Sequence, residues 1–148
     1  MSTLEKDIYK RQRIPANKQY QPITSRAYRG ISTVNPENKG FSLYDMALIK
    51  QDLINHFHIR KGEKLENPEF GTIIWDALFE PLTDELRNEI ADNVTTIVNY
   101  DPRIQAIKVT VDTFESGIQI ECDILFIPYN ISESLLLKFD QENGIVSE

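Results

Sequence analysis

Residues 104–127 read IQAIKVTVDTFESGIQIECDILFI, and apolar side chains recur at every second position on both sides of a Glu115–Ser116–Gly117 turn. Such alternation is typical of strands that bury one face, and two of them joined by a short polar turn form a hairpin. The stretch therefore predicts strands near 104–113 and 118–127. The side chains expected on the buried face are Ile107, Val109, Val111, Ile118, Ile120, Cys122, Ile124 and Phe126.

Apolar residues alternate once more downstream of the hairpin, at Leu135, Leu137 and Phe139. This pattern predicts a third strand near 133–139, which would cover one edge of the hairpin at most. The tail from Asp140 onward is polar, and we expect it to fray. An isolated hairpin is only marginally stable, so this small sheet must pack on other elements.

Three helices are predicted upstream of the hairpin, over residues 43–56, 68–78 and 84–99. Each has apolar residues at the three- and four-residue spacing of a helix with one buried stripe. Pro81 and Pro102 end the second and third helices. The expected N-caps are Ser42, Asn67 and Thr83. Helices followed by strands indicate an α+β fold, with about three helices packed on a small β-sheet built around the C-terminal hairpin.

The composition is that of an ordinary globular domain. The chain has 148 residues, of which 41% are hydrophobic and 26% charged, so it can build a core and is not disordered throughout. Its apolar runs are far shorter than the roughly 20 residues of a membrane span, and no secretory signal pattern begins the sequence. The single cysteine, Cys122, excludes an internal disulfide and fits folding in a cytoplasm.

The net charge of −7 is unevenly distributed. Residues 1–30 hold seven basic and two acidic residues, a net charge of +5, whereas residues 31–148 hold nine basic and 21 acidic ones, a net charge of −12. Prolines and glycines without periodicity predict an extended arm over residues 1–40, followed by a domain at 41–148. The acidic body would repel phosphate, so we expect no nucleic-acid partner. The arm is expected to lie on acidic protein, either its own body or a neighbour.

Three carboxylates in or beside a charged loop at 60–67 are candidates for a glycosidase pair, namely Glu63, Glu66 and Glu69. Glycoside hydrolysis needs two carboxyl groups held about 5–9.5 Å apart across a sugar-binding cleft. The nearby aromatic residues, Phe70 and Trp75, lie at core-like helical spacing, so the sequence shows no sign of such a cleft. We expect a solvated loop and no catalytic residue.

His56, His58 and Cys122 are candidates for a metal site. Two histidines separated by one residue on a helix point to different faces, and one distant cysteine does not complete a tetrahedral set of ligands. Cys122 has the same parity as its apolar neighbours and is expected to be a small buried side chain. No glycine-rich phosphate loop is present either, so we expect neither a metal nor another cofactor.

The tripeptide Asp101–Pro102–Arg103 lies between the third predicted helix and the first predicted strand. Proline ends the helix, and the planar guanidinium of Arg103 suits carboxylates and the last carbonyl groups of a helix. Two interpretations of these residues stay open. One is a local pair or helix cap within the chain, and the other is a docking contact with another protein.

Four stretches ahead of the hairpin have the order and spacing of a known family. They are Arg60–Lys61–Gly62–Glu63, Asn67–Pro68–Glu69–Phe70–Gly71, Leu78–Phe79–Glu80–Pro81 and Tyr100–Asp101–Pro102–Arg103–Ile104. The set resembles the lysozyme-like baseplate wedge proteins of contractile phage tails, whose relatives include the TssE subunit of type VI secretion systems. The resemblance covers roughly residues 40–128. The family motif at the corner is Glu-Pro-Arg, and Asp101 in place of glutamate keeps the charge but shortens its reach by one methylene.

The resemblance implies a structural role in the tail baseplate of a virion, assembled in the host cytoplasm. Family members sit in the wedge near the tail tube, and their corner docks on a helical core bundle of other wedge subunits. The residues expected to dock here are Asp101, Pro102 and Arg103. The hairpin resembles that of the tail sheath subunit, which implies strand addition by the sheath at an open sheet edge. The residues expected along that contact are Lys108, Thr110, Gln119 and Glu121.

The expected partners are thus other wedge subunits, the tail sheath protein and the tail tube, with no membrane. Two alternatives stay open. One is a peptidoglycan-cleaving, lysozyme-like enzyme. The other is a regulatory binding protein, because the wider family includes a bacterial anti-adaptor that controls turnover of a stress sigma factor.

Overall fold

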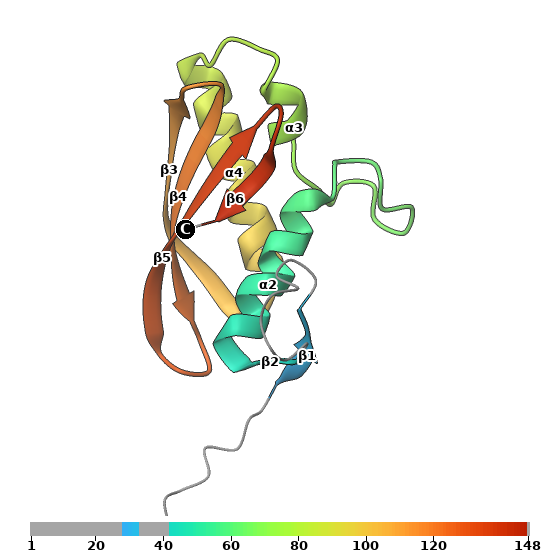
Figure 1. Ribbon diagram of the computed structural model, residues 1–148, viewed down its shortest axis with the longest axis vertical. Helices are drawn as coiled ribbons and strands as arrows, with labels where there is room; N and C mark the ends of the chain where they lie inside the picture. Colours follow the sequence, from blue (N-terminus) through green and yellow to red (C-terminus); the bar gives the residue numbers. More distant parts are fainter. Residues whose placement is uncertain (1–27, 33–41, 148) are drawn as a thin grey trace, which may run out of the picture.

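The computed structural model describes residues 28–32 and 42–147 (Figure 1). Most of the expected arm, residues 1–40, lies outside the described residues. Along the described chain a two-stranded ribbon is followed by three helices and a four-stranded sheet. Helices packed on one small sheet confirm the α+β prediction. None of the helices in this part of the chain is long and apolar enough to cross a membrane.

The main sheet has the strand order β3–β4–β5–β6, and all neighbouring strands are antiparallel. β3 (Ile104–Phe114) and β4 (Gly117–Phe126) form the predicted hairpin, and β5 (Ile131–Asp140) is the predicted third strand. The prediction of a frayed tail is wrong, because β6 (Gly144–Ser147) pairs with the last residues of β5. A turn through Gly144, at a φ of 76°, returns the chain along part of the edge that β5 would otherwise leave unpaired.

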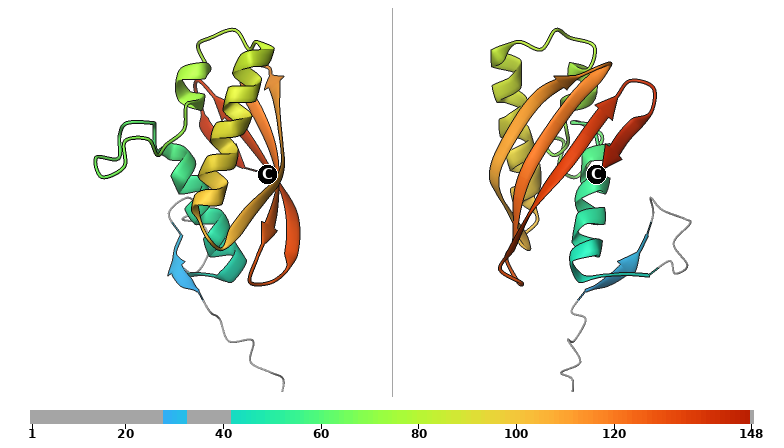
Figure 2. Two further views of the ribbon diagram at one scale, coloured as in Figure 1. Left: turned by 180° about the vertical axis from the view of Figure 1, so that it is seen from behind. Right: turned by 60° about the vertical axis from the view of Figure 1, so that its left-hand side comes forward.

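The helices lie on one face of the sheet, and no described helix covers the opposite face (Figure 2). α2 (Asp45–His58) and α4 (Asp84–Tyr100) are the long ones. Thr83 caps α4 as predicted, because its Oγ1 accepts a hydrogen bond from the backbone N–H of Leu86 at 3.2 Å. The cap supplies a partner for one of the N–H groups that the first turn of a helix leaves unpaired.

The first helix begins later than predicted. β2 (Ser42–Tyr44) pairs with β1 (Arg29–Ile31), so Ser42 lies in a strand and is not the N-cap. A reciprocal pair of hydrogen bonds fixes this junction. The backbone N–H of Tyr28 donates to Asp45 Oδ1, the backbone N–H of Asp45 donates to the carbonyl of Tyr28, and both contacts are 3.1 Å long. The described part of the expected arm therefore packs on the start of α2.

The second helix is much shorter than predicted, because α3 spans only Ile74–Ala77 and Asn67 does not cap it. Gly71 has a φ of 134°, which is incompatible with a helix. Thr72 then forms a bridge with Arg60 on the other side of the loop. The loop therefore closes on itself before the chain turns into α3.

A β-bulge changes which residues of β3 are buried. The register shifts between Ala106 and Lys108 and leaves Ile107 without a partner of its own on β4. The extra residue reverses the alternation upstream of it, and Ile107 is 59% exposed, contrary to the prediction that it faces the core. Downstream of the bulge, Val109 and Val111 pack on the core as predicted.

The core lies between the helices and the sheet. The rings of Phe57 in α2 and Phe139 in β5 meet edge to face with centroids 6.0 Å apart. Trp75 in α3 lies 5.5 Å from the Phe139 ring and donates its indole N–H to the backbone oxygen of Phe57 at 2.9 Å. These contacts join α2, α3 and the sheet into one unit. Further fully buried residues are Ile49, Leu53, Ile74, Ile90, Val94, Ile97, Ile120, Ile124, Phe126 and Leu137.

Candidate functional site

The Asp101–Pro102–Arg103 corner joins α4 to β3. Asp101 is the C-cap residue of α4, and its N–H donates to the carbonyl of Val98 at 3.3 Å. Its own carbonyl accepts the N–H of Ile104, the first residue of β3, at 3.2 Å. Pro102 is exposed and has no N–H with which to continue the helix. The corner therefore fixes Arg103 between the last turn of a long helix and the first pair of the hairpin.

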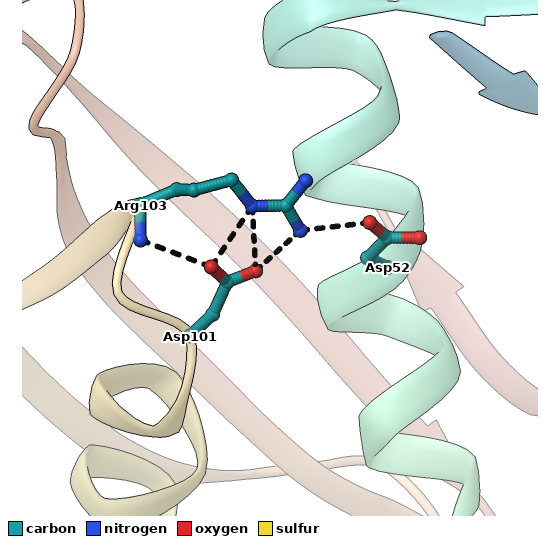
Figure 3. Close-up of polar contacts among 3 residues, drawn as sticks. All are labelled: Asp52, Asp101 and Arg103. Carbon is teal, nitrogen blue, oxygen red and sulfur yellow. Dashed lines mark hydrogen bonds and ion pairs between the residues drawn. The ribbon is translucent and has the colours of Figure 1, made fainter. Parts of the chain in front are cut away.

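Arg103 folds back on Asp101 (Figure 3). The backbone N–H of Arg103 donates to Asp101 Oδ1 at 3.0 Å, and its Nε lies 2.9 and 3.1 Å from the two carboxylate oxygens. Its Nη2 lies 2.5 Å from Asp101 Oδ2. Asp101 is only 7% exposed, so these charge-assisted hydrogen bonds replace the water that its carboxylate has lost.

The same guanidinium also contacts α2. Arg103 Nη2 donates to Asp52 Oδ2 at 2.8 Å, and the Arg103 Cζ lies 5.3 Å from the centroid of the Tyr28 ring. Tyr28 directly precedes β1 and is hydrogen-bonded to the start of α2. We call Tyr28, Asp52, Asp101 and Arg103 the corner cluster. It joins the α4–β3 corner, α2 and the segment before β1.

The corner cluster stabilises the charged forms of both partners. Burial by itself would raise the pKa of Asp101, but the hydrogen bonds from Arg103 outweigh it, so that this pKa lies below its ordinary value. The hydrogen bonds to Asp101 raise the pKa of Arg103 in turn, against the opposing effect of burial. The pair therefore stays ionised at neutral pH and acts as a structural clamp.

Of the two interpretations that the sequence left open, the local pair is confirmed. Nε and Nη2 of Arg103 are occupied within the chain, whereas Nη1 has no hydrogen-bond partner among the described residues. The Arg103 side chain is 21% exposed. Sequence reasoning missed Asp52, which lies 51 residues away, and did not connect Tyr28 with the corner.

The expected strand-addition residues lie on two different kinds of strand. Lys108 and Thr110 belong to β3, an outer strand whose one sheet neighbour in the described chain is β4 (Figure 1). Gln119 and Glu121 belong to β4, which pairs with β3 on one side and β5 on the other. The sequence left open which edge of the hairpin would accept a strand. The backbone of β4 is hydrogen-bonded to strands on both sides, so β4 has no open edge. Of the two hairpin strands, β3 is therefore the one to which another strand could add by main-chain hydrogen bonds.

The three candidate carboxylates lie in the exposed loop between α2 and α3. Glu63 accepts the backbone N–H of Arg60 at 2.9 Å, and Glu69 pairs with Lys61 at 3.3 Å. Glu66 is exposed, like the other two. The structure therefore places them where a solvated loop was expected.

The candidate metal ligands do not come together. The His56 ring lies 5.2 Å from the ring of Phe70, whereas the His58 ring stacks on Trp75 at 6.3 Å. Cys122 is buried in the sheet, and burial together with the nearby Asp123 raises the pKa of its thiol to about 11. Within the described residues, no group of three or more His, Cys, Asp or Glu side chains is arranged to hold a metal ion.

Comparison with known proteins gives the fold and the corner a context. A family model described as "Baseplate wedge protein gp25" matches residues 45–127. The chain is similar to the baseplate wedge protein gp25 of Enterobacteria phage T4, with 30% identity over 102 residues, which are 66% of this chain and 76% of the T4 protein.

Two solved structures share the fold. One is a putative tail lysozyme from Geobacter sulfurreducens, with 22% identity and a TM-score of 0.53 over 65% of this chain and 91% of the other. The second is a chain of the anti-feeding prophage baseplate, with 19% identity and a TM-score of 0.52 over 66% of this chain and 79% of the other.

An α+β domain that carries this hairpin and corner, and that matches a wedge family over more than half of its length, is a structural component of a contractile-tail baseplate. The chain belongs to the gp25 family of baseplate wedge proteins. Its place is the tail baseplate of a virion, as the resemblance in its motifs predicted.

Proposed function

We propose that this wedge protein docks through its corner on a helical core bundle of other wedge subunits, near the tail tube, and initiates the tail sheath by strand addition to β3. The observation that carries the proposal is the pairing of a rigid, partly exposed corner with β3, an outer strand that begins at that corner and has a regular edge from Lys108 to Phe114. Both features lie within residues 45–127, the stretch that matches the wedge family.

The corner supports docking because it is rigid before any partner arrives. Asp101 and Asp52 hold the guanidinium of Arg103 in one place, which lowers the entropy lost on binding. Nη1 of Arg103 is left to donate to a carbonyl or carboxylate of the bundle, and Pro102 is exposed beside it. Under this proposal, Arg103→Ala weakens incorporation into wedges by about 30-fold or more. Incorporation at the wild-type level by the folded variant would refute docking.

The edge of β3 supports strand addition because an outer strand exposes unpaired N–H and C=O groups. The N–H of Ala106 is the exception, since it donates to Asn99 Oδ1 at 2.9 Å, so the added strand would pair downstream of the bulge. β3 is 11 residues long, and its polar side chains Lys108 and Thr110 face away from the core. Main-chain hydrogen bonds tolerate variation in the sequence of the added strand, so an extended sheath segment suits this edge. Gln119 and Glu121 would then contact that segment through their side chains only, from the neighbouring strand.

Proline substitution tests the edge directly. N–H groups alternate in direction along a strand, so those of Thr110 and Thr113 point to opposite sides of β3. One of the variants Thr110→Pro and Thr113→Pro therefore loses a bond to β4, and the other loses only a group at the open edge. The open-edge variant should fold and build baseplates that fail to polymerise sheath. Normal sheath on that variant would refute strand addition to β3.

We also propose that the protein is not an enzyme. The exposed positions of Glu63, Glu66 and Glu69 and the match to a structural wedge protein support this. The alternative is a lysozyme-like activity, which the name putative tail lysozyme suggests for the Geobacter protein. Purified protein should release no soluble fragments from peptidoglycan. Turnover that disappears in Glu63→Gln or Glu69→Gln would establish the enzymatic alternative. The regulatory alternative draws on the wider family only, and no contact of the described residues favours it.

A further inference from the structure

A groove between α3 and the first half of α4 combines an apolar floor with an acidic rim. Its volume is about 290 Å³. Ile73, Ala77 and Leu86 are the buried or half-buried residues that line it, and three exposed carboxylates complete the lining. These carboxylates are Asp76, Glu80 and Glu89. We call this site the acidic groove.

The three carboxylates of the acidic groove are free to bind a cation, and they gather around one apolar floor. In the part of the chain that the structure describes, none of the three makes an ion pair or a side-chain hydrogen bond. By contrast, in the hollow on the sheet beside Ile107, Asp123 accepts a hydrogen bond from Ser134 and Glu133 pairs with Lys50. Residues 76–92 hold six acidic residues and one basic residue, so the groove lies in a strongly negative region.

We propose that the acidic groove binds residues 10–13 of this chain's own N-terminal arm. That stretch reads Lys-Arg-Gln-Arg and is the densest basic stretch of residues 1–27, which hold six basic and two acidic residues. A lysine or arginine has an apolar stem and a charged head. Its stem fits the floor at Ile73, Ala77 and Leu86, and its head fits between the carboxylates of the rim.

The arm begins close enough to reach the groove in the same molecule. Tyr28 lies at the C-terminal end of α4, where it contacts Arg103, and Leu86 lies near the other end of that helix. A helix of 17 residues is about 25 Å long. The chain from residue 13 to Tyr28 spans up to about 50 Å when extended. A tether of this length also gives the arm a high effective concentration at the groove.

Limited trypsin digestion of the full chain tests the proposal, because trypsin cleaves after Lys10, Arg11 and Arg13. The rate is measured relative to a synthetic peptide of residues 1–27, and the wild-type chain should be cleaved more slowly than the peptide. The variant Asp76→Asn/Glu80→Gln/Glu89→Gln removes three charges and keeps the shapes. It should be cleaved about tenfold faster than wild type, as expected for the loss of three exposed ion pairs.

The variant Glu63→Gln/Glu66→Gln/Glu69→Gln is the matched control, because it changes the net charge equally in the loop between α2 and α3. It should be cleaved at the wild-type rate. Equal acceleration of both variants would overturn the proposal in favour of diffuse attraction by the whole body. Cleavage of wild type as fast as the peptide would overturn it as well. Protection that increases with protein concentration would assign the groove to the arm of a second copy instead.

Discussion

Replacing Arg103 by alanine removes the clamp between the corner and α2 and leaves the Asp101 carboxylate buried without its partner. Breaking a buried ion pair costs about 3–5 kcal/mol. Arg103 is 21% exposed and the Asp52 side chain 36%, so water compensates part of the loss, and the lower end of that range, about 3 kcal/mol, applies. Domains are stable by about 5–15 kcal/mol, so the variant should still fold at 25 °C.

The pH dependence gives the clamp a signature of its own. In wild type the pKa of Asp101 is lowered, so its contribution to stability is present above about pH 4 and is lost as the pH falls below that. Without Arg103 the effect of burial dominates and raises this pKa. The variant then gains from protonation of Asp101, and its deficit relative to wild type should shrink as the pH is lowered from 7 toward 4. Urea unfolding at several pH values measures both stabilities.

Arg87→Ala is the matched control, because Arg87 faces the exposed Asp112 at 3.7 Å and such a pair contributes about 0–1 kcal/mol. Two results would refute the reasoning. One is a cost of Arg103→Ala no larger than that of Arg87→Ala. The other is a deficit that stays constant between pH 7 and pH 4.

Three further predictions concern backbone geometry, a half-buried histidine and the arm. Gly71→Ala should lower the free energy of unfolding in urea by about 3 kcal/mol, because φ is 134° and the new Cβ would lie 2.5 Å from the Arg60 backbone. Gly62→Ala is the control, because the new Cβ would meet open space, and it should lower that free energy by about 1 kcal/mol. Burial lowers the pKa of His56, although the charges of Asp101 and Asp52 act in the opposite direction. The free energy of unfolding should therefore fall as the pH drops from 7 to 5, and His56→Phe should make it less dependent on pH in this range. Deletion of residues 1–27, which spares Tyr28, should leave thermal unfolding cooperative and make incorporation into baseplates weaker; an unfolded product would contradict a separable arm.

The sheet and the last helix were predictable because their signals are local. Alternation over residues 104–126 identifies two strands, and Thr83 followed by acidic residues marks the start of α4. The bulge at Ile107 was not predictable, since an inserted residue is recognised only from its partner strand. β6 was missed for a similar reason, because Gly144–Ser147 is too short to show an alternating pattern and is recognised as a strand only by its pairing with β5.

The candidate site was likewise predicted only in part. The corner was found from Pro102 and Arg103, because proline and a nearby guanidinium leave a recognisable pattern at the end of a helix. The partners that decide its chemistry were not found. Asp52 lies on another helix, and Tyr28 lies in a stretch without periodicity. Only the packing of α2 beside the corner brings them to Arg103.

The unequal ends of the main sheet limit how many partners it can join. β3 offers a regular outer edge downstream of its bulge, from Lys108 to Phe114, whereas the other side of the sheet is stepped, because the four residues of β6 cover only part of β5. A strand added on the stepped side would have to pair partly with β6 and partly with the uncovered part of β5, and these two edges are not collinear. In the language of polymer chemistry the sheet is a monofunctional unit. Under the proposed strand addition, such a sheet would start a chain of added strands without being a repeating link in it, and growth from it would proceed in one direction.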